Sequence, residues 1–193
     1  MNEKGLVKSE KIYTVEEYLN FERRDPSRHE FHKGKILAAS SSSRRHNLIG
    51  SNTIIALGSR LRGHKCEIYV NDMRVKISDF DYCYPDVIIV KGEPKFDGNE
   101  TDILLNPTII IEILSRKTLY YDKTEKLESY MKMPSVSDCL LIKEDEMRIE
   151  HYAKQNSKQW MFRIYNESEE MIALESIGCK SALSEIYAQI RFN

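Results

Sequence analysis

The amino-acid sequence predicts an α/β fold in which helices pack on a mixed β-sheet. Two near-continuous aliphatic runs, at residues 86–90 and 108–114, are typical of central strands that are covered on both faces. Helical periodicity comes before these runs at residues 44–62 and after them at residues 119–133. Elements that alternate in this way pack as layers around one core, and a chain of 193 residues is long enough for one such domain.

The first expected elements are a helix and a hairpin. Thr14 is followed three residues later by Glu17, which is the spacing of a capping box. We therefore expect a helix that begins at Thr14 and ends near Arg24. Residues 28–31 and 35–39 flank a Lys-Gly pair and predict a β-hairpin.

The long helix that precedes the aliphatic runs is expected to end at Gly63. Its expected buried positions include Leu48, Ile55, Leu57 and Leu61. Two strands follow, at residues 66–70 and 73–77. The second of them alternates apolar residues with Arg74 and Lys76, so we expect one buried face and one solvated face.

The second half of the chain is expected to complete the sheet. The polar residues 91–106, between the two aliphatic runs, predict an exposed loop, and the helix at 119–133 ends at Pro134. The remaining expected elements are strands at 138–143, 147–154, 159–165 and 171–174 and a short helix at 183–190. The last three of these strands form a C-terminal β-meander, which either extends the sheet or forms a partner surface.

Composition excludes some classes of protein. The net charge of −1 counts against a dedicated high-affinity nucleic-acid binder, but not against an enzyme that contacts a few phosphates. The apolar runs are too short for a membrane span, and residues 1–12 are polar and predict a flexible leader rather than a signal peptide. We therefore expect a cytoplasmic protein whose single domain covers residues 13–193. The four scattered cysteines form no CxxC pair and are expected to be reduced core thiols rather than zinc ligands.

Two acidic residues lie where an uncompensated charge is costly. Glu112 lies inside the second aliphatic run, where a carboxylate needs protonation, a cationic partner or a metal. Asp86 opens the first run directly after Pro85. Taken alone, Glu112 can be half of a buried ion pair and Asp86 a turn residue. On adjacent paired strands the two carboxylates can converge on one Mg²⁺ ion, and we interpret them together as a metal or catalytic site.

A metal site of this kind suits hydrolysis of a phosphodiester. Such a reaction also needs a cation, because negative charge develops on the phosphate oxygens. The helix after Glu112 supplies Lys126, which lies beside Leu127 and Tyr130, two residues expected to face the core. Its ammonium can extend along the sheet toward the carboxylates. Taken alone, Lys126 is more typical of a solvated helix lysine.

These residues belong to an ordered set of short motifs that covers most of the chain. The motifs are Tyr13-Thr14-Val15-Glu16-Glu17-Tyr18, His29-Glu30-Phe31, Lys33-Gly34-Lys35-Ile36, Tyr84-Pro85-Asp86-Val87, Ile111-Glu112-Ile113-Leu114-Ser115 with Thr118, Tyr121-Asp122 with Lys126 and Tyr130, Ser176-Ile177-Gly178, and Leu183-Ser184-Glu185-Ile186-Tyr187. The set resembles the Uma2 family, a group of endonuclease-like proteins, also catalogued as a domain of unknown function, in the PD-(D/E)XK superfamily.

The resemblance implies a restriction-endonuclease-like core of helix, three strands, helix and strand (αβββαβ), to which the N-terminal helix and hairpin and the C-terminal meander are added. It implies that Asp86 and Glu112 are ligands of Mg²⁺ or Mn²⁺. The superfamily pattern has a lysine two residues after the glutamate, whereas this chain has Leu114. The Uma2 pattern carries its lysine on the following helix, which assigns that role to Lys126.

Further polar residues join the expected site. Glu30 lies in the hairpin, where the family pattern also has an acid, and can bind a second metal ion or orient a water. His46 can contact the scissile phosphate or the metal's surroundings. For each of these two residues the alternative is a surface or hydrogen-bonded role. Arg44, Arg45 and Arg116 are expected to hold the nucleic-acid backbone.

The expected activity is hydrolysis of a nucleic acid, with DNA as the expected substrate. A homodimer is expected because cleavage of two strands needs two sites. One alternative is an inactive nuclease-fold module that binds nucleic acid or protein and keeps the acids as an ion pair with Lys126. Another is a metal-dependent hydrolase of other phosphate esters.

Overall fold

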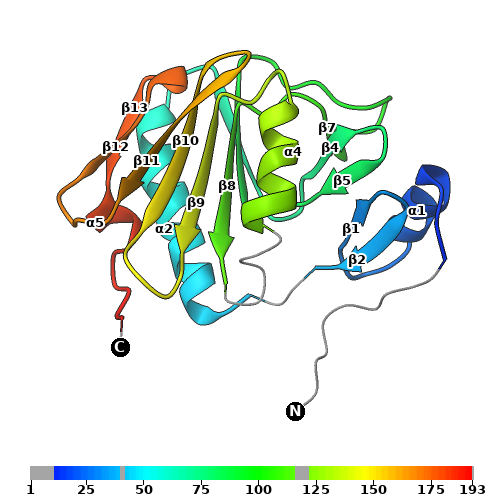
Figure 1. The fold of residues 1–193 in the computed structure, drawn as a ribbon, viewed down its shortest axis with the longest axis horizontal. Helices are drawn as coiled ribbons and strands as arrows, with labels where there is room; N and C mark the ends of the chain where they lie inside the picture. The colour runs from blue at the N-terminus through cyan, green and yellow to red at the C-terminus, as the bar shows by residue number, and fades with distance from the viewer. Residues whose placement is uncertain (1–10, 40–41, 116–121, 193) are drawn as a thin grey trace.

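The computed structural model describes residues 11–39, 42–115 and 122–192. A six-stranded sheet, in the order β11-β10-β9-β8-β6-β3, lies at its centre (Figure 1). Its strands in chain order are β3 (Cys66–Val70), β6 (Val87–Lys91), β8 (Ile109–Leu114), β9 (Asp138–Lys143), β10 (Ile149–Asn156) and β11 (Gln159–Tyr165). β8 pairs in parallel with β9, and the other neighbouring pairs in this sheet are antiparallel.

Two helices cover opposite faces of the central sheet (Figure 1). On one face, α2 (Arg44–Leu61) contributes Leu57 and other apolar residues to the larger core. On the other face, α4 (Leu127–Lys132) contributes Leu127 and Tyr130 to a second core. All six residues of β8 are buried between these layers, which explains why its sequence is almost wholly aliphatic.

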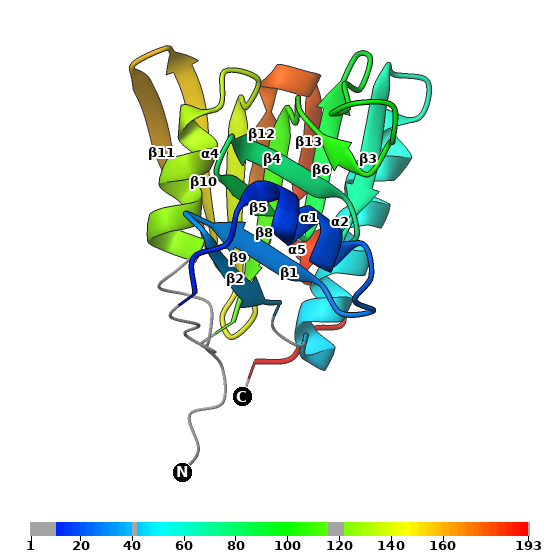
Figure 2. The same ribbon diagram turned by 90° about the vertical axis from the view of Figure 1, so that its right-hand side faces the viewer.

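A second sheet lies beside the central one and carries the first helix, α1 (Val15–Glu22) (Figure 2). Its order is β2-β1-β5-β4-β7, with β1 (His29–His32), β2 (Lys35–Ala38), β4 (Arg74–Ser78), β5 (Asp81–Cys83) and β7 (Ile103–Leu104). The ring of Tyr18 on α1 stacks on Phe31 of β1 with ring centroids 4.8 Å apart. Because β5 leads directly toward β6, this sheet fixes the entry of the chain into the central sheet at Asp86.

The C-terminal elements complete the α2 side of the molecule. β12 (Met171–Leu174) and β13 (Cys179–Ala182) form a two-stranded sheet, joined by the short helix η2 (Glu175–Ile177) and followed by α5 (Leu183–Ile186). Their apolar residues join the larger core. The expected meander is therefore divided, because β10 and β11 extend the central sheet whereas β12 pairs with β13.

The expected α/β fold class is confirmed, and so is the αβββαβ order through α2, β3, β6, β8, α4 and β9. The capping box is also confirmed. The hydroxyl of Thr14 accepts from the Glu17 N–H at 3.1 Å, and the Glu17 carboxylate accepts from the Thr14 N–H at 2.8 Å. The hairpin and the long helix form within one or two residues of the expected bounds.

Two burial predictions are wrong, and a third expected core residue, Leu48, is only half-buried. Ile55 was expected in the core but is 68% exposed, because its side of α2 faces solvent rather than the sheet. Arg74 was expected on a solvated face but is only 5% exposed. The strand β4 joins the second sheet, where the Arg74 guanidinium lies over the rings of Tyr18 and Tyr84.

Three segments also differ from the expected elements. The polar stretch 91–106 contains the buried strand β7, which pairs in parallel with β4 and is not simply an exposed loop. The short strands β5 and β13 were not expected, and the last helix ends at Ile186 rather than at Ile190. Residues 122–126 form a π-helical segment, η1 (Asp122–Lys126), that runs directly into α4. The expected leader lies mostly at residues 1–10, outside the described residues.

Two class-level expectations can be compared with the structure. Within the described ranges, no helix is both long enough and apolar enough to cross a membrane. The four cysteines are free thiols, and three of them are buried, as expected for small core side chains.

The sheet arrangement predicts that substitution of two different isoleucines by alanine lowers the free energy of unfolding by very different amounts. Replacement of Ile111, which is fully buried in β8, by alanine should lower the free energy of unfolding by about 2–5 kcal/mol, because it leaves a cavity between two packed layers. The matched change Ile55→Ala on α2 should alter it by less than about 0.5 kcal/mol. Urea unfolding followed by circular dichroism measures both, and equal losses would contradict the layer assignment.

Candidate active site

The two acids singled out in the sequence lie at opposite positions of paired strands. Val87 of β6 is in register with Ile111 of β8, so the preceding Asp86 lies opposite Glu112. Side chains alternate between the faces of a strand, and Glu112 shares its face with Ile110 and Leu114 on the α4 side of the sheet. Asp86 itself lies one residue before β6, so the contacts of its carboxylate, rather than the register, place it beside β8.

Glu112 is compensated by two donors from the segment that follows β8. It is 4% exposed. Its Oε1 atom accepts from the Tyr130 hydroxyl at 2.5 Å and from the Lys126 Nζ atom at 3.2 Å. A buried carboxylate without such partners would cost several kcal/mol, so these contacts explain how the aliphatic strand tolerates a charge.

Lys126 also contacts the second sheet. Its Nζ atom lies 2.7 Å from Glu30 Oε1 on β1, and the same Glu30 oxygen accepts from the Tyr84 N–H at 3.3 Å. Lys126 is 8% exposed, so the alternative of a solvated helix lysine does not describe it. One ammonium therefore bridges two acids, one from each sheet.

Asp86 is fixed by the strand that it faces and by α2. Its Oδ2 atom accepts from the Ile113 N–H at 2.7 Å and so continues the ladder between β6 and β8 beyond Val87. The same oxygen lies 3.2 Å from His46 Nε2, in the first turn of α2. The side chain of Asp86 is 19% exposed and that of His46 is 14% exposed, so both are more accessible than Glu112.

The Tyr130 hydroxyl stays protonated across the physiological pH range. Burial raises the pKa of Tyr130 well above its ordinary value, and the neighbouring Cys83, Glu112 and Glu30 raise it further. A phenol that keeps its proton is a permanent donor to Glu112. The sequence analysis gave Tyr130 only a core-facing role, although its position four residues after Lys126 puts both side chains on one helix face.

The available side chains fit a magnesium site in which the protein supplies only one or two ligands. Among the described residues, no group of three or more His, Cys, Asp or Glu side chains is arranged to hold a metal ion. Mg²⁺ commonly binds one or two protein carboxylates and keeps several waters. The pair Asp86 and Glu112 matches that requirement, whereas Glu30 is directed at Lys126.

The three arginines expected at the nucleic-acid backbone are only partly placed. Arg44 and Arg45 lie beside His46 in the first turn of α2, Arg44 exposed and Arg45 half-buried. They are therefore on the same helix end as the Asp86 contact. Arg116 lies outside the described residues.

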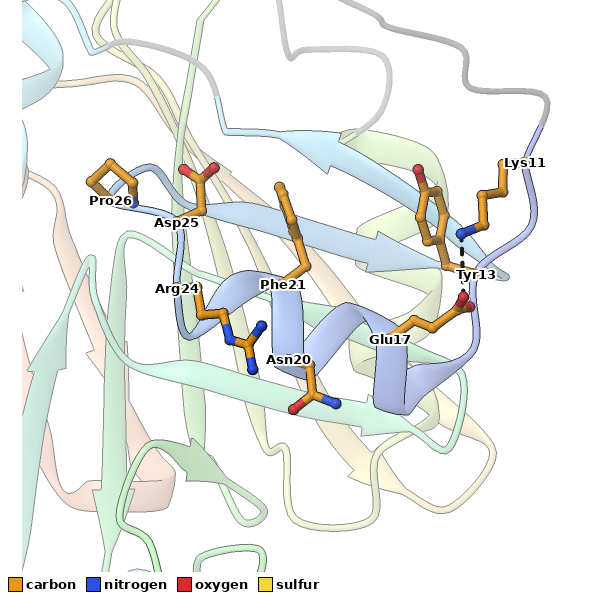
Figure 3. Close-up of a pocket in the computed structure, with 8 residues that line it drawn as sticks. All are labelled: Lys11, Tyr13, Glu17, Asn20, Phe21, Arg24, Asp25 and Pro26. Atoms are coloured by element: carbon orange, nitrogen blue, oxygen red, sulfur yellow. Dashed lines mark hydrogen bonds and ion pairs between the residues drawn. The ribbon is translucent and has the colours of Figure 1, made fainter.

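The surface hollow drawn in Figure 3 is separate from these residues. It has a volume of about 540 Å³ and lies against α1, where Lys11 and Glu17 form an ion pair of 3.2 Å. It is lined by residues between Lys11 and Pro26, and none of the expected site residues is among them. The chemistry of the acids is consequently not associated with this hollow.

Known proteins that resemble this chain indicate its family and its fold. The model of the Uma2 family, described as "Putative restriction endonuclease", matches residues 15–183. Two uncharacterised Synechocystis proteins are similar in sequence. One, sll1609, is 35% identical over 81% of this chain and 89% of its own length, and the other, slr1290, is 31% identical over 92% of each chain. The crystal structure of a "putative nuclease belonging to DUF820" from Anabaena variabilis has the same fold, with a TM-score of 0.74, 19% identity, and coverage of 92% of this chain and 99% of that one.

Removal of the bridging ammonium should destabilise the fold. Lys126→Met leaves Glu30 and Glu112 without their shared cation, so the free energy of unfolding at neutral pH should fall by about 3–5 kcal/mol. The control is Lys132→Met, which breaks a 2.7 Å pair with Glu128 that is exposed on both sides and should have no measurable effect. Chemical denaturation compares the variants, and an unchanged Lys126→Met protein would show that the bridge is not needed.

The Tyr130 proton should govern part of the alkaline stability. Because the pKa of Tyr130 is raised in the folded protein, its stabilising contribution is complete below the ordinary pKa of 10.0 and is lost as the pH rises above that value. The parent should lose up to about 1.4 kcal/mol per pH unit more than Tyr130→Phe in this range. Urea unfolding at several alkaline pH values measures the two slopes, and parallel slopes would contradict the assignment.

Proposed function

The chain belongs to the Uma2 family, and we propose that it is a metal-dependent endonuclease that hydrolyses phosphodiester bonds of DNA. The observation that carries the proposal is that Asp86 accepts from the Ile113 N–H at 2.7 Å, next to Glu112, whose Oε1 atom lies 3.2 Å from the Lys126 ammonium. Two acids and a lysine gathered around residues 112–113 of β8 would supply metal ligands and a charge-balancing cation in one place.

Asp86 and Glu112 are the proposed ligands of Mg²⁺ or Mn²⁺. A divalent ion bound there would supply Lewis acidity toward the phosphate and lower the pKa of a water. Each carboxylate is held by other groups of the chain, Asp86 by the Ile113 N–H and Glu112 by the Tyr130 hydroxyl. This support keeps the ligand oxygens oriented before any ligand binds.

Lys126 is proposed to orient the attacking hydroxide or to balance charge on the phosphate oxygens. Glu30 lies 2.7 Å from the same ammonium and is proposed to take part in orienting the water or in holding a second ion. His46, beside Asp86, is proposed to contact the scissile phosphate. Arg44, Arg45 and Arg116 are proposed to bind the backbone phosphates, where a planar guanidinium suits the phosphate oxygens.

Duplex cleavage adds a requirement for two sites. One active site cuts one strand, so we include a homodimer in the proposal, with one site for each strand.

A second candidate is an inactive module that binds nucleic acid or protein. The contact between Lys126 and both Glu112 and Glu30 favours it, since a buried ion pair can be structural. Titration with Mn²⁺ distinguishes the two. The enzyme should bind the ion in the parent and lose binding in Asp86→Asn, whereas the module should bind none in either protein.

Substitution of either acid should abolish cleavage while the fold is kept. Asp86→Asn and Glu112→Gln preserve side-chain shape, and each should slow Mg²⁺- or Mn²⁺-dependent cleavage of DNA by about 100-fold or more. The control Glu93→Gln changes an exposed acid and should cleave as the parent does. Assays on duplex DNA, single-stranded RNA and a nucleotide ester, with circular dichroism of each variant, measure this. Cleavage by the double variant at the parental rate would refute the assignment.

A further inference from the structure

Another acid, Glu150, lies on the same face of the central sheet as Glu112 and has no role in the proposed chemistry. Glu150 on β10 is 2% exposed. In the register of the sheet, Glu112 pairs with Leu141 of β9, and Leu141 pairs with Glu150. The two acids therefore lie in one cross-strand row, two strands apart, which is about 10 Å between their backbones.

Glu150 is held by two cations. Its Oε1 atom lies 2.6 Å from Lys123 Nζ and 3.1 Å from Arg148 Nε. Burial raises the pKa of the Glu150 carboxyl, but the hydrogen bonds and charges of Lys123 and then Arg148 outweigh this and hold it below its ordinary value. The acid is therefore ionised at neutral pH and anchors Lys123 as a charged pair.

Lys123 and Lys126 belong to the same short segment, η1, which is π-helical. Lys123 contacts β10 through Glu150, and Lys126 contacts β8 through Glu112 and β1 through Glu30. Glu125, between them, lies 3.3 Å from His32 Nε2 on β1. Together these ion pairs connect the segment to β10, β8 and β1, which gives them a means of fixing its rotation about its axis. A π-helical turn is rare and often marks a functional site, so its orientation is a property that side chains must enforce.

We propose that Glu150 is a positioning residue for Lys126, which acts by holding Lys123 and thereby fixing the rotation of η1 that directs the Lys126 ammonium to Glu112. This role rests on the proposed nuclease function for its catalytic consequence, although the positioning of η1 does not depend on it. Glu150 itself touches neither substrate nor metal.

The role of Glu150 can be tested without unfolding the protein, because Lys123 and Arg148 can become solvated when Glu150 is replaced. The side chains of Lys123 and Arg148 are each 30% exposed, so both can turn to solvent when Glu150 becomes neutral. Glu150→Gln keeps the side-chain volume and leaves no cavity. The matched control is Glu128→Gln, which removes a 2.7 Å pair with Lys132 from the adjacent helix and does not involve η1.

The experiment has two measurements. Hydrogen exchange followed by mass spectrometry reports the amides of residues 122–127, and these should exchange about 10-fold faster or more in Glu150→Gln and in Lys123→Met, but not in Glu128→Gln. In single-turnover and steady-state cleavage assays, Glu150→Gln and Lys123→Met should each lower kcat about 10- to 100-fold with little change in KM. Lys123→Arg, which keeps the charge, should restore both measurements toward the parent.

The outcomes separate this inference from the proposed function. If the parent does not cleave DNA, the nuclease proposal fails and hydrogen exchange alone decides the positioning of η1. Exchange in Glu150→Gln that matches Glu128→Gln would overturn the inference. So would effects of Glu150→Gln and Lys123→Met that simply add in the double variant, because residues that act through one contact must be coupled.

Discussion

The structure depends on the compensation of one buried carboxylate. Glu112 lies in a strand whose six residues are all buried, and its charge is tolerated because Tyr130 and Lys126 donate to the same oxygen. Both donors come from the segment that crosses from β8 to β9. The acid therefore determines how that crossover packs on the sheet, and the hydrogen-bond requirement of a single side chain links the core to the site.

The same requirement joins the two sheets. Lys126 reaches Glu30 on β1 as well as Glu112 on β8. Tyr84, which donates its N–H to Glu30, is held by Arg74 at 2.8 Å and by Glu22 at 2.8 Å through its hydroxyl. Since Tyr84 lies two residues before Asp86, this network also sets the direction from which the chain reaches the site. The second sheet thus helps to orient Asp86 and Glu112, in addition to carrying α1.

Local sequence patterns predicted much of the fold, because capping and helical periodicity depend on interactions between residues close together in the chain. The cap at Thr14 and the 18-residue helix α2 follow from spacing and periodicity within one segment. The failures share another cause. Ile55 and Arg74 have the local appearance of a core and a solvated residue, yet their exposures are reversed because distant elements do or do not cover them. The buried strand β7 was missed for the same reason, as only its pairing with β4 makes it a strand.

The sequence by itself determined the fold class and the order of the core elements, and it singled out the two acids, since a carboxylate in an aliphatic run is anomalous without any coordinates. Tertiary structure alone decided which groups meet these acids. The Ile113 N–H holds Asp86 beside Glu112, the packing of α4 brings Tyr130 and Lys126 to Glu112, and the second sheet supplies Glu30. Contacts between residues far apart in the chain arise from how layers pack, and periodicity in one segment carries no information about the layer that will face it.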